Sequence, residues 1–173
     1  MTTSIDVIER ELALLTVDLT GFTRAAATSR ALDLATFLDT YYRLCSGAVT
    51  GHHGRVVKFM GDACFAVFSE AHCLDAVDCA LDLQRDVAHL TGIYGSRPPS
   101  LGANVHRAIV ADGEIGAPHD RRYDVFGEGV NHLFRMGGGA GIRISEPVYR
   151  SLPNDRRGRW KKHRPVATYV LEG

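Results

Sequence analysis

The alternation between apolar and polar positions divides the chain into strands and helices. An uninterrupted apolar run over residues 12–17 predicts a buried strand. Apolar residues then recur at helical spacing over 30–49, which predicts an amphipathic helix that Gly51 and Gly54 end. A second amphipathic helix is predicted over 74–90.

Two short runs between these helices, 55–59 and 64–68, are rich in β-branched and aromatic residues and predict a hairpin that turns at Gly61. Two segments predict non-repetitive chain, namely the proline-containing loop 96–100 and the irregular stretch 113–120. The remaining predicted elements are strands at 101–110, 123–126 and 142–145, helices at 129–136 and 146–152, and a closing hairpin of 159–162 and 168–171.

The predicted order of elements is β-α-β-β-α-β with further elements added. This order is typical of the ferredoxin-like, or palm-like, α+β fold, in which helices cover one face of a mainly antiparallel sheet. A length of 173 residues suits one domain spanning 1–173, and the chain contains no repeat, low-complexity tract or linker. Residues 1–10 are predicted to form an N-terminal arm.

The charge balance argues against large anionic partners. Twenty basic and twenty acidic residues give a formal net charge of zero, so no long-range attraction to nucleic acid or to an anionic membrane is expected. No apolar run is long enough to span a bilayer, and residues 1–10 lack the apolar core of a secretory signal. The sequence therefore predicts a cytoplasmic protein without nucleic-acid or membrane partners.

The cysteines predict neither disulfides nor a structural zinc site. None of the four has C-x-x-C spacing, and the adjacent pair of His72 and Cys73 does not have the spacing of such a site. Free, buried thiols in a cytoplasmic protein are the better interpretation. The cysteines are Cys45, Cys64, Cys73 and Cys79.

Two aspartates carry the candidate chemistry. Asp18 ends the first predicted strand three residues before Gly21, and Asp62 follows Gly61 at the tip of the predicted hairpin. Taken singly, each has a better structural interpretation, Asp18 as a helix cap and Gly61-Asp62 as a hairpin turn pair. Two carboxylates that meet at the top of one sheet, however, form a hard-cation site, and Mg²⁺ leaves its other positions to water or phosphate. This arrangement suits phosphoryl chemistry with two metal ions.

Further polar residues lie in otherwise apolar or glycine-rich surroundings. Lys58 interrupts the apolar run of the first hairpin strand, and Asp124 precedes Gly127. Asn131 and Arg135 are four residues apart and share one helix face, and an arginine fork suits phosphate recognition. Taken alone, each is an ordinary solvated position. A basic cluster near the C-terminus comprises Arg159, Lys161, Lys162, His163 and Arg164.

Four segments in order resemble the catalytic domain of the class III nucleotidyl cyclases, the adenylate and guanylate cyclase family. The resemblance runs from about residue 12 to residue 171. In the first segment an aspartate stands three residues before Gly-Phe-Thr, and the third reads Asp-x-x-Gly-x-x-Val-Asn-x-x-x-Arg. The segments are 15–23, 54–62, 123–135 and 145–149.

The resemblance implies a role for each matching position. Asp18 and Asp62 would bind two Mg²⁺ or Mn²⁺ ions per site. Lys58 and Asp124 would read the base. The triphosphate would lie on the backbone of Leu19, Thr20, Gly21, Phe22 and Thr23 at a helix N-terminus. The ribose and the reacting phosphate would be held by Asn131 and Arg135, and the outer phosphates by Lys161 or, in its place, Lys162. Two shared sites in a head-to-tail homodimer are also implied.

The chain departs from the family pattern in the fourth strand. His106-Arg107-Ala108 stands where the family usually has His-Thr-Gly, and Asn104 stands where it has glycine. These changes concern local strand packing and the dimer surface rather than the proposed catalytic groups.

The base can be argued from donors and acceptors. Lys58 only donates and Asp124 only accepts, which matches N1 and the amine of adenine and opposes guanine. The predicted reaction is therefore the conversion of ATP into 3′,5′-cyclic AMP and pyrophosphate. Cytosine shows the same polarity as adenine, so a pyrimidine nucleotide cyclase of phage defence, making cCMP or cUMP, is an alternative.

Two other classes of protein share this kind of fold. A non-catalytic nucleotide-binding module is disfavoured because Asp18, Asp62, Asn131 and Arg135 are all present. A palm-type polymerase or nuclease is disfavoured by the zero net charge.

Overall fold

A single sheet organises the protein, and the computed structural model describes residues 6–163 and 168–171. The described strands follow the order β2-β3-β1-β4-β6-β8-β7, and β5 pairs with β4 outside this path. The β4–β6 pair is parallel and every other pair is antiparallel. The strands are β1 (Asp6–Leu19), β2 (Arg55–Met60), β3 (Ala63–Ser69), β4 (Leu101–Ala117), β5 (Asp120–Phe126), β6 (Gly141–Ser145), β7 (Trp160–His163) and β8 (Thr168–Leu171).

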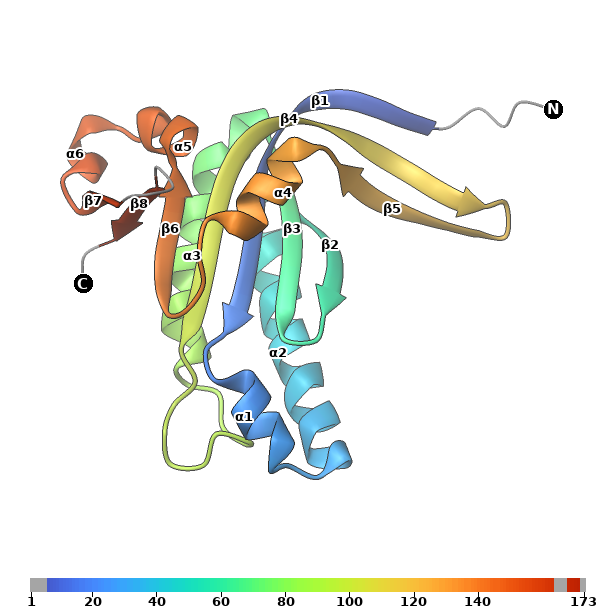
Figure 1. Ribbon diagram of the computed structural model, residues 1–173, viewed down its shortest axis with the longest axis vertical. Coiled ribbons are helices and arrows are strands. Elements are labelled where there is room, and N and C mark those ends of the chain that lie inside the picture. The colour runs from blue at the N-terminus through green and yellow to red at the C-terminus, as the bar shows by residue number, and fades with distance from the viewer. Residues whose placement is uncertain (1–5, 164–167, 172–173) are drawn as a thin grey trace.

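Helices cover both faces of the sheet (Figure 1). The long helices α2 and α3 pack on one face, and the short helix α4 lies on the other. The helices are α1 (Phe22–Ala27), α2 (Ala31–Gly51), α3 (Cys73–Val87), α4 (Glu128–Arg135), α5 (Glu146–Ser151) and α6 (Asn154–Arg157), with a 3₁₀ turn η1 (Glu70–His72) before α3.

Both faces of β1 are covered, which explains why its apolar run is uninterrupted. Successive side chains of a strand point to opposite faces. Leu15 and Val17 join the core beneath α2 and α3, whereas Leu12 and Leu14 join a second core with Leu133 of α4. The prediction that helices lie on one face is therefore wrong, although the predicted α+β class and mainly antiparallel sheet are confirmed.

The predicted hairpins and long helices are present with shifts of a few residues at their ends. The apolar periodicity identified α2 and α3, and the β-rich runs identified β2 and β3. The closing hairpin is β7 and β8. The helix expected after the turn at Gly21 is α1. Helix α6 is not predicted by the sequence, because four residues are too few to show a period.

A long ribbon of β1, β4 and β5 differs from the predicted elements. Residues 6–11 belong to β1 and pair with 109–114 of β4, so residues 6–10 are strand rather than arm, and residues 1–5 lie outside the described part. Residues 113–117, expected to be irregular, continue β4 and pair with β5. Gly113 in the sequence favours a loop. In the structure, a Cβ atom on this residue would lie 2.0 Å from the carbonyl oxygen of Asp6, so glycine allows the two strands to approach closely.

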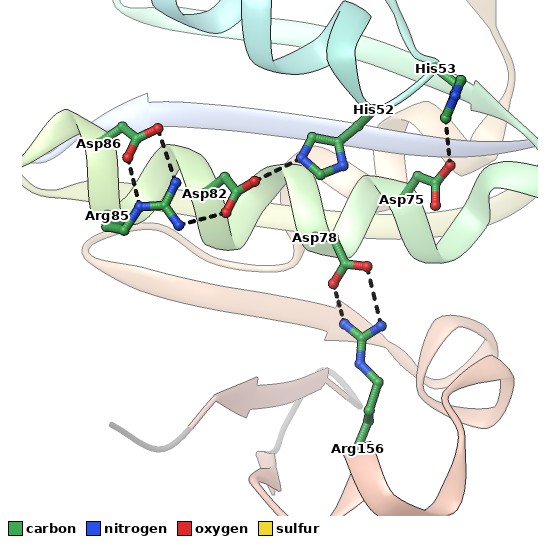
Figure 2. A network of polar contacts seen from close by, with 8 residues as sticks. All are labelled: His52, His53, Asp75, Asp78, Asp82, Arg85, Asp86 and Arg156. Carbon is green, nitrogen blue, oxygen red and sulfur yellow. Dashed lines mark hydrogen bonds and ion pairs between the residues drawn. The ribbon is translucent and has the colours of Figure 1, made fainter.

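The four cysteines are free and buried, as predicted. Within the described residues, no helix has both the length and the apolar composition that crossing a membrane requires. Arg156 of α6 forms an ion pair with Asp78 of α3, as Figure 2 shows. This contact connects a C-terminal element to the helix layer.

Candidate active site

The two candidate metal ligands lie at the same end of the sheet. Asp18 is the penultimate residue of β1, and Asp62 lies in the turn between β2 and β3. The Asp62 Oδ2 atom accepts a hydrogen bond of 3.1 Å from the backbone N–H of Leu19, the residue after Asp18. This bond brings the carboxylate at the hairpin tip to the end of β1.

A glycine makes room for the Asp18 side chain. Gly102 of β4 is the cross-strand partner of Asp18. A Cβ atom on Gly102 would lie 2.6 Å from Asp18 Oδ1 and 2.4 Å from the carbonyl oxygen of Gly139, so a side chain at this position would displace the carboxylate.

The electrostatics of this pair favour a cation. Burial, and then the negative charge of Asp62, raise the pKa of Asp18, while the positive charge of Arg143 opposes the shift. No ion pair between described residues involves either carboxylate. Two half-buried carboxylates without a paired side-chain cation have the donor chemistry that Mg²⁺ and Mn²⁺ require.

Helix α2 supports the turn that carries Asp62. Gly61 has a φ of +64°, a left-handed conformation that glycine adopts without strain. The hydroxyl of Tyr42 donates a hydrogen bond of 2.6 Å to the Gly61 carbonyl. The Tyr42 ring stacks on Phe59 with centroids 3.9 Å apart, so the turn is held from the side.

Residues 19–23, the segment predicted to hold the triphosphate, already use two of their backbone amides in hydrogen bonds within the protein. The amide of Leu19 donates to Asp62, and the amide of Thr20 donates to the Ser100 carbonyl at 2.8 Å. Gly21 then turns the chain into α1 with a φ of +76°. Of the five residues predicted to hold the triphosphate through their amides, Gly21, Phe22 and Thr23 therefore remain as donors.

The two candidate base-reading residues are in direct contact. Lys58 Nζ of β2 lies 2.6 Å from Asp124 Oδ2 of β5, although the residues are 66 positions apart. The other carboxylate oxygen of Asp124 accepts a bond of 2.8 Å from the Val125 amide. The pair is partly exposed, with side-chain exposures of 42% for Lys58 and 23% for Asp124, so a ligand can reach it.

The candidate catalytic residues lie on the outer face of α4. Asn131 and Arg135 are both exposed. Both bind Glu128 in the first turn of the helix: Asn131 Nδ2 donates to Glu128 Oε2 at 3.2 Å, and Arg135 forms an ion pair with the other oxygen. Glu128 stands three residues before Asn131 and seven before Arg135. This spacing places all three on one helix face, so it could have identified Glu128 from the sequence.

Helix α4 is tied to the sheet where the chain departs from the family pattern. The Asn104 amide donates to the carbonyls of Leu133 and Gly137 at 3.3 and 2.9 Å, near the C-terminal end of α4. The ring of His106 lies 4.5 Å from that of His132 on the same helix. Burial, and then His132, lower the pKa of His106 to about 4, so this ring is neutral at pH 7. These positions therefore anchor the helix that carries Asn131 and Arg135.

Within one chain, Lys161 is not brought to the metal ligand Asp18 of β1. It lies in β7, which β4, β6 and β8 separate from β1 in the sheet order. At about 4.8 Å per strand, this is a separation of roughly 20 Å. The alternative, Lys162, is also exposed, and its Nζ lies 5.6 Å from the Tyr169 ring. Arg164, the last residue of the basic cluster, lies outside the described residues.

The remaining candidates thus form two groups. The metal group contains Asp18, Asp62 and the segment 21–23. The nucleoside group contains the Lys58–Asp124 pair together with α4. In the part of the chain that the structure describes, no hydrogen bond or ion pair between side chains joins the two groups. Each group is open to solvent and carries only part of the chemistry that the sequence analysis assigned to one site.

The sequence matches a known family over nearly its whole length. A family model described as the adenylate and guanylate cyclase catalytic domain matches residues 8–173. An adenylate cyclase of Anabaena cylindrica is 28% identical over 155 residues, covering 83% of this chain and 31% of that protein. An uncharacterized protein of Mycobacterium tuberculosis is 32% identical over 131 residues, covering 74% of this chain and 23% of that protein. The chain therefore spans less than a third of these relatives.

Solved structures share the fold. The guanylyl cyclase Cya2 superposes with a TM-score of 0.85 at 24% identity, covering 98% of this chain and 95% of that chain. The adenylyl cyclase CyaB from P. aeruginosa superposes with a TM-score of 0.84 at 21% identity, covering 98% and 97%. These likenesses confirm the palm-like fold, and the family match confirms the resemblance seen in the four sequence segments. The chain belongs to the adenylate and guanylate cyclase catalytic domain family.

Proposed function

We propose that this chain is an adenylate cyclase domain that converts ATP into 3′,5′-cyclic AMP and pyrophosphate. The observation that carries the choice of ATP is the contact of 2.6 Å between Lys58 and Asp124. The other features support a cyclase of either purine type, and members of both types share this fold.

The Lys58–Asp124 pair can keep its own bond and still read a base. A lysine has three N–H donors, and a carboxylate offers about four lone-pair sites. Lys58 therefore retains a donor for N1 of adenine, and Asp124 retains an acceptor for the amine. Guanine presents a donor and an acceptor in the reverse places, so neither group could hydrogen-bond the base. Such a mismatch disfavours GTP relative to ATP by several orders of magnitude.

The reaction closes a ring on the substrate. The ribose 3′-oxygen forms a bond to the α-phosphorus, the bond from that phosphorus to the bridging oxygen breaks, and pyrophosphate leaves. The hydroxyl proton passes to solvent. Asp18 and Asp62 would hold the two Mg²⁺ or Mn²⁺ ions, which when bound lower the pKa of the hydroxyl and neutralise triphosphate charge.

The side chains of α4 act on the reacting groups. Arg135 keeps its charge at any physiological pH and stabilises the negative charge that gathers on the α-phosphate. Asn131 orients the ribose. Glu128 holds both side chains before substrate arrives and gives up Arg135 to the phosphate. Removal of one such group typically costs about a hundredfold in rate.

Two separate half-sites in one chain support a homodimer. In a two-fold dimer, the metal group of one chain would meet the nucleoside group of the other, and two equivalent sites would result. Exposed Phe134, with 45% of its surface accessible beside Arg135, is consistent with a covered face. In this arrangement Lys161 contacts the outer phosphates.

Two partner and location predictions accompany the proposal. The zero net charge supports a nucleotide partner without nucleic acid or membrane. The four free thiols are typical of the cytoplasm.

The pyrimidine alternative rests on the same contact. Cytosine presents N3 and an amine with the polarity of adenine, so Lys58 and Asp124 accept it as well, and ring size and stacking must exclude it. We therefore expect cyclic AMP as the main product when the protein is incubated separately with ATP, GTP, CTP and UTP plus Mn²⁺ or Mg²⁺.

The same assay tests the base-reading pair. Lys58→Glu should lower kcat/KM for ATP by about a hundredfold, because the donor to N1 becomes an acceptor. Arg122→Glu, a matched charge reversal on exposed β5, should change it less than threefold. Cyclic CMP or cyclic UMP as the main product would favour the pyrimidine alternative. Cyclic UMP, like cyclic GMP, would also contradict the pairing argument, because uracil and guanine both present an N–H donor and a carbonyl acceptor in the reverse places.

A mixing experiment tests the shared sites. Asp18→Ala and Asn131→Ala should each be inactive, because every site then lacks a required group. After co-refolding, half the dimers are mixed and half their sites are intact, so about a quarter of wild-type activity should return.

The matched control combines two defects of the metal group. In a mixture of Asp18→Ala and Asp62→Ala, every site lacks one carboxylate, so activity should stay absent. If Asp18→Ala and Asn131→Ala form mixed dimers without any recovery, the sites are not shared.

Thermal unfolding tests the metal group without turnover. Asp18→Asn removes one of two mutually repelling charges, so the Tm of the metal-free protein should rise by about 2–4 °C, which corresponds to about 1 kcal/mol. Mg²⁺, which prefers oxygen ligands, should stabilise the wild type and Asp155→Asn, whose exposed aspartate lies on α6, but not Asp18→Asn. Equal stabilisation of Asp18→Asn by Mg²⁺ would exclude Asp18 as a ligand.

A further inference from the structure

A second cluster of metal-ligating side chains lies at the far end of the β2–β3 hairpin from Asp62. His53, His72 and Asp75 each offer one ligand atom, and these atoms all lie within 4.8 Å of one another. Strand β2 has six residues. At about 3.3 Å per residue, the cluster and the hairpin tip are roughly 20 Å apart. The cluster is therefore separate from the candidate active site.

One carboxylate oxygen joins the two imidazoles. His53 Nδ1 lies 3.0 Å and His72 Nδ1 2.6 Å from the same atom, Asp75 Oδ2. The two rings stack with centroids 4.5 Å apart. Figure 2 shows His53 directed at Asp75 of α3, whereas the neighbouring His52 is directed at Asp82.

The fold brings these residues together from separate elements. His53 follows α2, His72 ends η1, and Asp75 lies in the first turn of α3. The hairpin between α2 and η1 returns the chain to its starting point. Sequence spacing could not reveal the cluster, because its members come from separate elements. Cys73, the neighbour of His72 in sequence, is buried in the core and takes no part.

The backbone of His53 has an unusual conformation. The amide of His53 donates to the Thr50 carbonyl at 3.0 Å and that of Gly54 to the Val49 carbonyl at 2.8 Å. These bonds form a Schellman motif, in which the position of His53 is usually glycine. Among the described residues, His53 is the non-glycine residue with positive φ, at +63°. Glycine would fit this backbone without strain, yet a histidine stands there with its ring at Asp75.

A local role explains only part of the cluster. The contact between His72 and Asp75 spans three residues at a helix start and is ordinary by itself. The addition of His53 from another helix, in a strained conformation, is not explained by capping. Nor does a nearby guanidinium occupy the cluster: Arg55 lies over the Tyr123 ring at 3.5 Å, and Arg10 pairs with Asp112.

We propose that His53, His72 and Asp75 bind a first-row transition-metal ion, with Zn²⁺ as the representative. Two imidazole nitrogens and one carboxylate oxygen suit Zn²⁺, whereas Mg²⁺ prefers oxygen alone. Ligand atoms around tetrahedral zinc are about 3.3 Å apart, given bonds of about 2.0 Å. The two nitrogen–oxygen separations are shorter than this value by about 0.3 and 0.7 Å, and all the ligand atoms lie within 4.8 Å of one another, so side-chain rotations that move the imidazoles slightly away from the carboxylate would complete the site. Water takes the exposed position.

The bound ion would pin the end of α2 to the start of α3. Tag-free, metal-stripped protein carrying Asp18→Ala tests this, because the candidate active site then contributes little. With Mg²⁺ present throughout, Zn²⁺ at about a hundredfold excess over its Kd should raise the Tm by about 5–10 °C. Calorimetry should give one Zn²⁺ per chain.

His53→Gly separates ligation from folding. In metal-free buffer its Tm should equal or exceed that of the parent, which is the protein carrying only Asp18→Ala, because glycine relieves the strained backbone. The Zn²⁺-dependent shift should nevertheless disappear. His72→Gln should also remove the shift, and His119→Gln, at the exposed β4–β5 turn, should retain it.

The outcomes are distinct. Absence of Zn²⁺ binding by the parent, or an undiminished shift in both His53→Gly and His72→Gln, would overturn the site. Co²⁺ identifies the donors: a thiolate charge-transfer band would assign the metal to cysteine and overturn the proposal, whereas a spectrum without that band supports histidine and carboxylate ligands. Loss of cyclase activity plays no part in these measurements, so this proposal and the proposed function fail separately.

Discussion

Two carboxylates that repel each other share the end of one sheet, and much of the surrounding structure serves to keep them there. The Leu19 amide holds Asp62, Gly102 leaves space for Asp18, and the Tyr42 hydroxyl holds the turn at Gly61. Burial and mutual repulsion raise the pKa of Asp18. A bound divalent cation would relieve this repulsion, which would link the fold to the proposed chemistry.

The two-sided cover of the sheet explains why one chain holds two half-sites. Helix α2 supports the metal group from one face, through the Tyr42 hydroxyl at the Gly61 turn. Helix α4 carries Asn131 and Arg135 on the other face, where Asn104 ties its C-terminal end to β4. A glycine at position 104 would lack these bonds. The Asn104 side chain thus tethers the helix that carries the proposed catalytic groups.

The sequence predicted the elements whose signals are local. The apolar run of β1, the periodic helices α2 and α3, and Gly61 at the hairpin turn were all legible, and so were the positions of Asp18 and Asp62 at strand ends. The resemblance of four segments in order identified the family. Lys58 and Asp124, to which the resemblance assigns base reading, are in contact, and that role stays a prediction.

What the sequence could not give depends on tertiary contacts. The face that α4 covers is set by packing of Leu133 against β1, and Gly113 marks a close strand contact rather than a loop. The carbonyl partners of Asn104 lie in another element. His53 and His72 meet only because the β2–β3 hairpin reverses the chain between them. No spacing rule within one segment reports such contacts.

The central claim is that Asp18 and Asp62 together hold the ions that act on a nucleotide. A crystal structure with Mn²⁺ and a non-hydrolysable ATP analogue tests it directly, because anomalous scattering locates manganese independently of the protein atoms. The account predicts two manganese peaks at bonding distance, about 2.0–2.3 Å, from oxygens of both carboxylates and from the triphosphate. Manganese bound to the triphosphate with neither carboxylate as a ligand would contradict it.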